Sequence, residues 1–179
     1  NPRVLLLDEP LSALDEFLRL RMRGELRRVQ KELGITFIHV THTQLEAIAV
    51  ADTVVVMTQG RIEQAASARD IFIAPKSAYV ARFVGGQNVL MGSVESIMND
   101  TAAVASPSGA RFAFPVGEVR PARGSKLYGS IRRDRIVVEK LAPGTKPAAG
   151  LNSVAGAVHT IENQGSYVKV TLDLADDEE

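Results

Sequence analysis

The chain has 179 residues, and its 21 basic and 21 acidic side chains leave no formal net charge. This balance argues against a nucleic-acid-binding protein, which normally carries an excess of Lys and Arg. The chain contains no cysteine, which excludes disulfides and thiolate metal sites. No apolar run approaches the ~20 residues that a membrane-spanning helix needs. The length of the chain is sufficient for one or two globular domains.

The first apolar segment, Val4–Leu7, runs into the acidic pair Asp8 and Glu9. Such a short run of branched residues predicts a strand buried on both faces of a parallel sheet. Pro10 ends the strand because it has no N–H for the ladder. Carboxylates at the carboxyl end of a strand lie where open α/β sheets bind ligands, which indicates a site for a cation or an activated water. The alternative is that the two acids only favour the start of the next helix.

Residues 16–33 carry apolar side chains at helical spacing and predict an amphipathic helix that ends at Gly34. We interpret its arginine-rich opposite face as a solvated outer face, because acids are interspersed along it. A second buried strand is predicted at residues 35–40. Thr43 and Glu46 then form the pattern of a capping box that begins a helix over residues 44–51. Strands that alternate with helices imply a parallel sheet.

The next elements form a hairpin and two short helices. The sequence predicts a strand over residues 53–57, a tight turn at Gln59-Gly60 and a returning strand over residues 61–64. Short helices follow at 67–73, with Ser67 as the N-cap, and at 77–84.

The character of the chain changes after Asn88. Short strands separated by Gly, Pro, Asn and Ser clusters predict a small barrel or sandwich. The expected strands are residues 89–97, 110–114, 126–132, 136–139, 154–161 and 167–174.

Three motifs in this order resemble one known family. VLLLDEPLSALD (residues 4–15) resembles the Walker B strand and D-loop of ABC-transporter ATPases. FIHVTHTQLEA (residues 37–47) resembles their H-loop, and VVVMTQGRIEQ (residues 54–64) resembles the hairpin that closes the nucleotide-binding domain. The remainder resembles the TOBE domain of importer subunits, although Arg133 stands where that family often has a proline.

The resemblance implies an α/β fold class followed by an all-β part. Residues 1–86 would be the C-terminal part of the nucleotide-binding domain, with a partial P-loop NTPase sheet and its helices. Residues 87–179 would be an OB-like TOBE barrel.

The resemblance also implies roles for individual residues. Asp8 would be the Walker B acid that holds the Mg²⁺ shell, through water, and Glu9 would orient or deprotonate the attacking water. His42 would be the switch histidine that reaches the γ-phosphate of ATP. Ser12 and Asp15 would belong to the D-loop between two ATPase subunits. From the residues alone, Ser12 and Asp15 are equally a turn with a helix N-cap.

The other two histidines, His39 and His159, lie inside expected strands and are interpreted as structural. Thr43 occupies a position where the family usually has Asp. This departure keeps a capping oxygen but removes a negative charge.

No P-loop motif, Q-loop or LSGGQ signature is found in the sequence, and the family places all three before the Walker B strand. We therefore expect the chain to be the C-terminal part of a longer protein and to be inactive alone. Its unpaired strand edges favour association with another chain.

The resemblance implies the ATP-hydrolysing subunit of an ABC importer, which uses ATP and Mg²⁺. Its partners would be a second copy, transmembrane permease subunits and, indirectly, an extracytoplasmic solute-binding protein, without nucleic acid. Its place would be the cytoplasmic face of the inner membrane, as a peripheral protein. Polyamines are the favoured cargo, before iron or sugars. The alternative is that the β-rich half is a regulatory or ligand-binding module without activity of its own.

Overall fold

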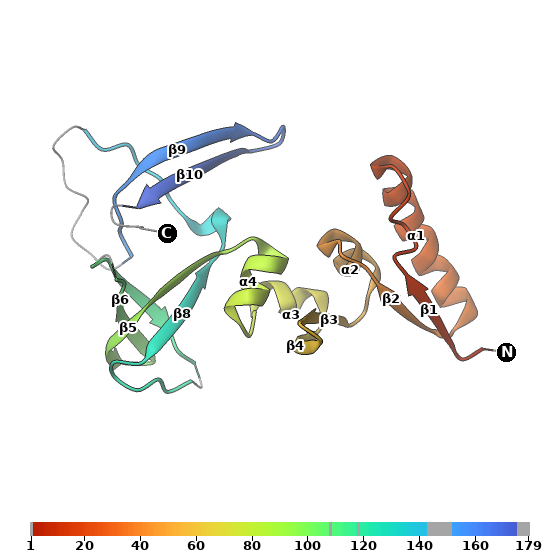
Figure 1. Cartoon of the computed structure of the whole chain (residues 1–179), viewed down its shortest axis with the longest axis horizontal. Helices are drawn as coiled ribbons and strands as arrows, with labels where there is room; N and C mark the ends of the chain where they lie inside the picture. The colour runs from red at the N-terminus through yellow and green to blue at the C-terminus, as the bar shows by residue number, and fades with distance from the viewer. Residues whose placement is uncertain (1, 108, 118, 143–151, 175–179) are drawn as a thin grey trace. The chain divides into compact units, whose positions relative to one another are not determined.

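The computed structural model describes residues 2–107, 109–117, 119–142 and 152–174 (Figure 1). The chain divides into two compact units, Asn1–Asn88 and Val89–Glu179. The elements of the first part of the chain are β1 (Val4–Asp8), α1 (Glu16–Leu33), β2 (Thr36–Val40), α2 (Gln44–Val50), β3 (Val54–Thr58), β4 (Arg61–Ala66), α3 (Ala68–Ile73) and α4 (Ala78–Gly85). They are followed by β5 (Asn88–Met98), β6 (Thr101–Ala105), β7 (Arg111–Pro115), β8 (Lys126–Ile131), the 3₁₀ turn η1 (Arg133–Arg135), β9 (Gly156–Asn163) and β10 (Val168–Leu174).

Strands β1 and β2 pair in parallel, as the alternation of strands and helices predicts. The register runs from Val4 opposite Thr36 to Asp8 opposite Val40, so the two strands end at the same level. The connection between them contains α1, which begins where the Asp15 side chain accepts a hydrogen bond from the Leu18 N–H at 2.9 Å. This pairing brings the segments that follow the two strands side by side.

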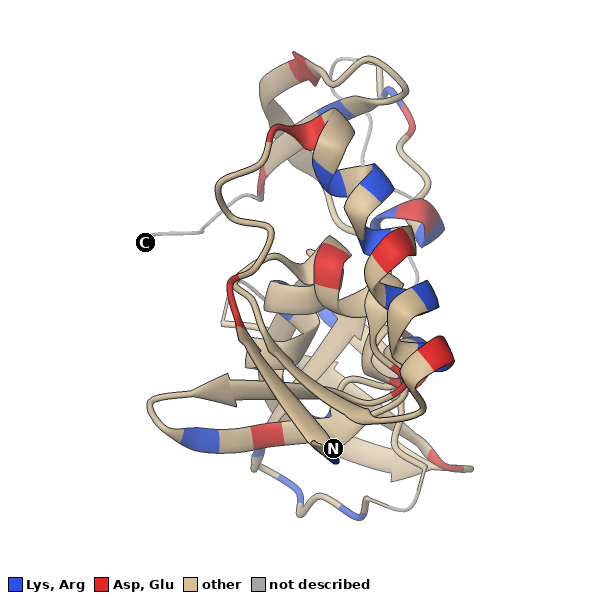
Figure 2. Ribbon diagram, turned by 90° about the vertical axis from the view of Figure 1, so that its right-hand side faces the viewer, with Lys and Arg blue, Asp and Glu red and all other residues tan. Residues whose placement is uncertain are grey.

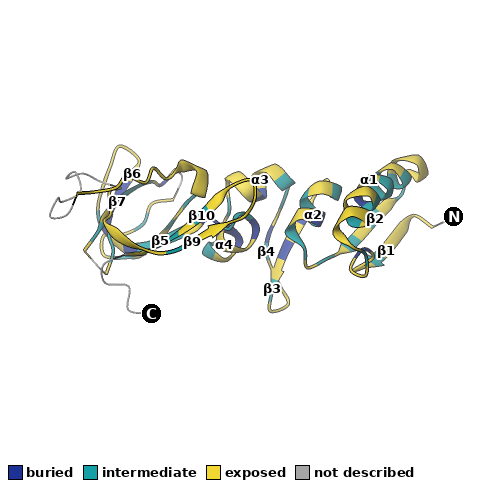
Figure 3. Ribbon diagram, turned by 90° about the horizontal axis from the view of Figure 1, so that it is seen from above, coloured by how far each residue is buried: buried dark blue, intermediate teal, exposed yellow. Residues whose placement is uncertain are grey.

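The prediction that these strands are buried on both faces is wrong for the described residues. Leu6 is 71% exposed and Ile38 is 50% exposed. Phe37 and His39, which alternate with Ile38 along β2, are only partly exposed. Within the described residues β1 and β2 form a two-stranded sheet, with α1 running alongside it (Figure 3). A layer with helices on one side leaves the opposite apolar side chains uncovered.

The outer face of α1 is solvated, as interpreted from its mixed charges. Basic and acidic residues are interspersed along this helix in Figure 2. Arg28 is ion-paired with Glu25 at 2.7 Å and with Glu32 at 2.6 Å. On the side nearer α2, Arg27 donates a hydrogen bond to the Val50 carbonyl oxygen at 2.6 Å. These contacts anchor α1 within the first unit.

The β3–β4 hairpin and helices α3 and α4 enclose the core of the first unit. Its buried side chains are Val54, Val56, Ile71, Val80 and Val84. The hairpin turns at Gln59 and Gly60, whose φ angles of 47° and 74° fit the left-handed turn that short hairpins prefer. Ser67 caps α3 by accepting a hydrogen bond from the Asp70 N–H at 3.1 Å, as predicted.

The second unit contains a four-stranded sheet in the order β7-β6-β5-β8. Its core side chains are Val94, Ala102, Val104 and Val116. The sheet is curled. Its outer strands β7 and β8 are separated by two strands in the sheet order, yet the Phe114 ring of β7 lies against Gly129 of β8. Strands β9 and β10 form a separate antiparallel hairpin with a bulge between Thr171 and Leu172. The described residues therefore give a curled antiparallel half-barrel and a ribbon, which agree only coarsely with the expected small barrel or sandwich.

Two sequence expectations in this unit are corrected by the structure. Strand β6 was not expected; it pairs with β5 across a turn at Asn99 and Asp100, whose φ angles are 47° and 61°. This Asn-Asp pair is a hairpin signal. Conversely, the strand expected at 136–139 does not form, and Val137 is 83% exposed. Its consecutive apolar residues lack the alternation of a half-buried strand.

None of the helices in the described part of the chain combines the length and the apolar character needed to cross a lipid bilayer.

The packing at Gly129 yields a stability prediction. A Cβ at this position would lie 2.2 Å from the Phe114 ring, so we expect Gly129→Ala to destabilise the second unit by about 1–3 kcal/mol through overpacking. Gly24→Ala is the contrasting variant, because Gly24 lies within α1 and a Cβ there would meet no other atom. We expect this substitution to stabilise the helix by about 0.5–1 kcal/mol. Urea denaturation followed by circular dichroism measures both. Equal stabilities of Gly129→Ala and the parent chain would contradict the close packing.

Candidate functional site

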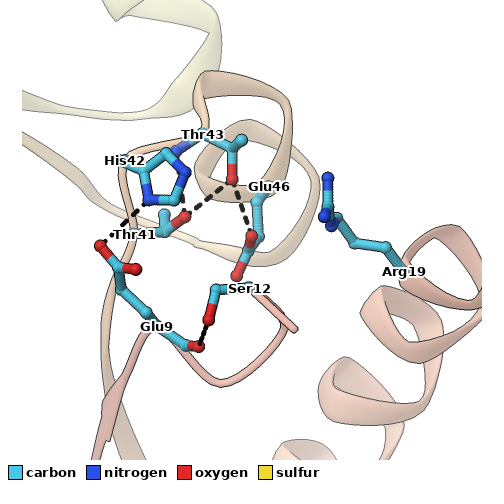
Figure 4. A pocket seen from close by; sticks show the side chains of 7 residues that line it. All are labelled: Glu9, Ser12, Arg19, Thr41, His42, Thr43 and Glu46. Atoms are coloured by element: carbon cyan, nitrogen blue, oxygen red, sulfur yellow. Dashed lines mark hydrogen bonds and ion pairs between the residues drawn. The ribbon is translucent and has the colours of Figure 1, made fainter. Parts of the chain in front are cut away.

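The carboxyl ends of β1 and β2 bring Glu9 and His42 together. The Glu9 N–H donates to the Val40 carbonyl oxygen at 2.9 Å, which extends the parallel ladder by one bond beyond the strands. His42 lies two residues further along. Its Nδ1 is 3.0 Å from the Glu9 Oε1 (Figure 4). Two side chains that are 33 positions apart in the sequence thus share one hydrogen bond.

Glu9 adopts an unusual backbone conformation. Its φ angle is 44°, in the left-handed region that residues with a Cβ rarely adopt. The conformation is held by Ser12, whose N–H and hydroxyl both donate to the Glu9 carbonyl oxygen, at 3.1 and 2.9 Å. Strained non-glycine residues cost on the order of 1–3 kcal/mol and cluster at functional sites. The strain is consistent with a functional role for this carboxylate.

The turn after Glu9 is clamped to the start of α1. Arg19 donates to the Leu14 carbonyl oxygen at 2.8 Å and to the Leu11 carbonyl oxygen at 3.4 Å. Leu11 itself is 3% exposed and anchors the turn in the interior. Asp15 is the N-cap of α1, so of the two interpretations of Ser12 and Asp15 the local one, a turn with a helix cap, describes their contacts within this chain.

Asp8 is exposed at the end of β1. Within the described residues, its side chain has no hydrogen bond or ion pair. It is one residue away from Glu9 but does not take part in the bond between Glu9 and His42.

A buried carboxylate, Glu46, lies behind His42. It is 3% exposed and belongs to the first turn of α2. The His39 Nε2 lies 2.5 Å from its Oε1, and the Thr43 hydroxyl donates to its Oε2 at 2.8 Å. His39 is therefore a satisfied structural residue, as interpreted from sequence.

The capping box expected from Thr43 and Glu46 is wrong in detail. Thr43 is the N-cap of α2 by position, but its side chain makes no hydrogen bond to the helix backbone. It bonds the Glu46 carboxylate instead, and its own N–H donates to the Thr41 hydroxyl oxygen at 3.1 Å. The Thr43 hydroxyl can bond either the backbone at the start of α2 or the Glu46 carboxylate. It bonds the carboxylate because Glu46 is buried, and a buried carboxylate without a partner is costly in free energy.

The pKa of Glu46 is lowered from its ordinary value. Burial raises this pKa because it disfavours the charged form. Hydrogen bonds from Thr43 and His39, together with the nearness of the Thr41 hydroxyl and of the His39 ring, lower it, and they outweigh burial. Glu46 is thus an ionised acceptor, so the proton of its bond with His39 resides on the His39 Nε2.

Glu9, Ser12, Arg19, Thr41, His42, Thr43 and Glu46 line a small hollow at this edge of the β1–β2 pair (Figure 4). The His42 side chain is 68% exposed and that of Glu9 is 46% exposed, so both are accessible from solvent. With Nδ1 directed to Glu9, the His42 Nε2 remains available to a ligand. In the part of the chain that the structure describes, no cluster of three or more His, Asp or Glu residues could by itself hold a metal ion.

The sequence alone did not predict that Glu46 accepts hydrogen bonds from both His39 and Thr43. The available signal was the pattern Thr-x-x-Glu together with His39, which shares the alternating inward positions of β2 with Phe37. A polar residue on a buried strand face requires a buried partner.

Comparisons with known proteins place the chain in a family. It is 38% identical over 177 residues to the spermidine/putrescine import ATP-binding protein PotA of Rubrobacter xylanophilus, covering 98% of this chain and 45% of that protein. It is 40% identical over 177 residues to the protein of the same name from Nitratidesulfovibrio vulgaris, covering 98% of this chain and 47% of that protein. The chain belongs to the ABC importer ATP-binding subunit family. It spans a little under half the length of these relatives.

The similarity is stronger over part of the chain. The PotA protein of Desulfitobacterium hafniense is 57% identical over 92 residues, which is 51% of this chain and 26% of that protein. No protein-family model matches the chain.

The ionised Glu46 yields a prediction about stability and pH. Because its pKa is lowered in the folded state, its stabilising contribution is fully present above the unfolded-state pKa of about 4.5 and is lost as the pH falls through the lower folded-state pKa. At neutral pH we expect Glu46→Gln to cost about 1.5–3 kcal/mol, since its partners lose a charged acceptor. The deficit in the free energy of unfolding relative to the parent chain narrows as the pH falls from neutral to values below about 4.5.

Urea denaturation at a series of pH values measures this difference. Asp52→Asn is the control, because Asp52 is an exposed carboxylate near the far end of α2 that pairs with Arg27 at 2.9 Å. A deficit of Glu46→Gln that stays constant across this pH range would show that Glu46 does not titrate as described.

Proposed function

We propose that this chain works as part of an ATP-hydrolysing subunit of an ABC importer, with Glu9 and His42 in its catalytic site. The observation that carries the proposal is the 3.0 Å bond between their side chains at the carboxyl ends of two parallel strands. This edge is where open α/β sheets bind ligands. Family membership supports the ATP-linked chemistry.

Asp8 is proposed to contribute to a Mg²⁺ site. Carboxylate oxygens suit Mg²⁺, which usually takes one or two of them and completes its shell with water and substrate phosphates. Asp8 is exposed and has no protein partner among the described residues, so its carboxylate is free to bind such a partly hydrated ion. When bound, Mg²⁺ neutralises charge on the phosphates.

Glu9 is proposed to orient the water that attacks the γ-phosphate and to accept its proton. The His42 Nδ1 holds one carboxylate oxygen, which leaves the other to face the water. The His42 Nε2 then faces the phosphate as a hydrogen-bond partner. Ser12 maintains the strained Glu9 backbone, and with Asp15 it is proposed to lie in the D-loop at the contact between two subunits.

The wider assignment rests on the relatives. The PotA relatives are described as spermidine and putrescine import proteins, so we propose polyamines as the cargo. A second copy and membrane permease subunits are the proposed partners, with a solute-binding protein acting outside. The proposed place is the cytoplasmic face of the membrane. The Val89–Glu179 unit is proposed to be a TOBE-type domain, for which its curled antiparallel sheet is suitable.

Glu9→Gln tests the catalytic assignment in the full-length protein that carries this segment. We expect ATP to bind as before while hydrolysis falls by about 10²–10⁴-fold, the usual contribution of a general base. Phosphate release and nucleotide binding are measured in parallel. Glu25→Gln is the control, since Glu25 is an exposed carboxylate on the outer face of α1. Hydrolysis by Glu9→Gln at the rate of the control would refute the role of Glu9.

The 179-residue chain alone should show no ATP hydrolysis. Its sequence has no G-x-x-x-x-G-K-[ST] loop, whose backbone N–H groups and lysine cradle the phosphates. Isothermal titration with Mg·ATP and a phosphate-release assay measure binding and turnover. A stable ATP complex of this chain would show that the phosphates are held in another way.

A further inference from the structure

The turn that carries His42 is tied to one buried side chain from both directions. Glu46 accepts hydrogen bonds from His39, three residues before His42, and from Thr43, one residue after it. The Glu46 side chain is 3% exposed and that of His39 is 11% exposed, so water competes little for these bonds. The end of β2 and the start of α2 are therefore joined through this carboxylate.

The hydroxyl protons in the network have defined directions. The single Thr43 hydroxyl proton is donated to Glu46, because an ionised carboxylate can only accept. The Thr41 hydroxyl, 2.8 Å from the Thr43 hydroxyl oxygen, must then be the donor in that contact. Thr41 in turn accepts from the Thr43 N–H. The two neighbours of His42 are thus bonded to each other twice, as Figure 4 shows for their side chains.

An ordinary helix cap does not explain this arrangement. The Thr43 side chain leaves the backbone of α2 without a cap hydrogen bond, although it stands at the N-cap position. Its bonds go to residues of the turn and to Glu46 instead. The network therefore orders the turn at the expense of the usual helix start.

We propose that Glu46 is a positioning residue for His42, and that it acts through His39 and Thr43 by fixing the turn that directs the imidazole toward Glu9. The catalytic meaning of this positioning rests on the proposed function. The geometric claim itself does not, since it concerns the bond between His42 and Glu9 in the chain alone.

Two variants remove the network without touching His42 or Glu9. Thr43→Val removes the hydroxyl but keeps the side-chain shape, and Thr43→Ser restores a hydroxyl. Glu46→Gln keeps the size of the side chain and removes its charge. Asp52→Asn is the matched control, because it removes a carboxylate near the other end of α2 and outside the network.

The direct measurement is the nuclear Overhauser effect between the His42 ring protons and the Glu9 side chain in the 179-residue chain. We expect it to be clear in the parent chain, Thr43→Ser and Asp52→Asn, and to fall by at least about half in Thr43→Val and Glu46→Gln, because its intensity drops steeply as the two groups separate. Circular dichroism verifies folding. If Glu46→Gln does not fold, the comparison of this intensity between Thr43→Val and Thr43→Ser tests the proposal. Parent-like intensity in folded Thr43→Val, or no effect in the parent chain, overturns the proposal.

Kinetics of the full-length protein separate this inference from the proposed function. We expect Thr43→Val to lower kcat by about tenfold with little change in KM, since a misplaced catalytic group costs up to ~10²-fold. Thr43→Ser should restore kcat. If Glu9→Gln hydrolyses ATP normally, the proposed function fails while the spectroscopic result still decides the positioning. If Glu9→Gln is inactive but Thr43→Val behaves like the parent in both assays, only the positioning role fails.

Discussion

The parallel pairing of β1 with β2 is the constraint on which the candidate site depends. Asp8 lies opposite Val40, and one further hydrogen bond joins the Glu9 N–H to the Val40 carbonyl oxygen. Because parallel strands run in the same direction, the segments that follow β1 and β2 leave the sheet at the same edge. A shift of one residue would turn the side chains of β2 to the opposite face. The bond between Glu9 and His42 therefore reports the strand register.

The environments of the two carboxylates differ according to their proposed tasks. Glu9 is half exposed and keeps one oxygen outside the bond with His42. Glu46 is buried and uses both oxygens in bonds with protein groups. Burial would favour the neutral acid, but donors on both oxygens keep Glu46 ionised. One carboxylate is thus accessible for chemistry, and the other is fully occupied by structure.

The second unit shows how close contacts shape an antiparallel sheet. Gly129 leaves room for the Phe114 ring, and Gly92 lies against the Ala105 carbonyl oxygen. These approaches let the sheet curl, so that its outer strands β7 and β8 approach each other. Strands β9 and β10 form a separate two-stranded ladder, and the His159 Nδ1 lies within hydrogen-bond distance of the Asp173 carboxylate, at 2.9 Å. His159 is accordingly structural in the described contacts.

The sequence by itself determined the elements that have strong local signals, which include α1 with its cap at Asp15, the Gln59-Gly60 hairpin and the short helix after Ser67. Periodicity and capping act within a few residues, so they can be recognised without a fold. Only the tertiary structure decided that Glu9 meets His42, that Thr43 bonds Glu46 rather than its helix, and that Leu6 and Ile38 stay exposed. These outcomes depend on which strands pair and which faces are covered. Such contacts join distant residues, and the local pattern does not contain them.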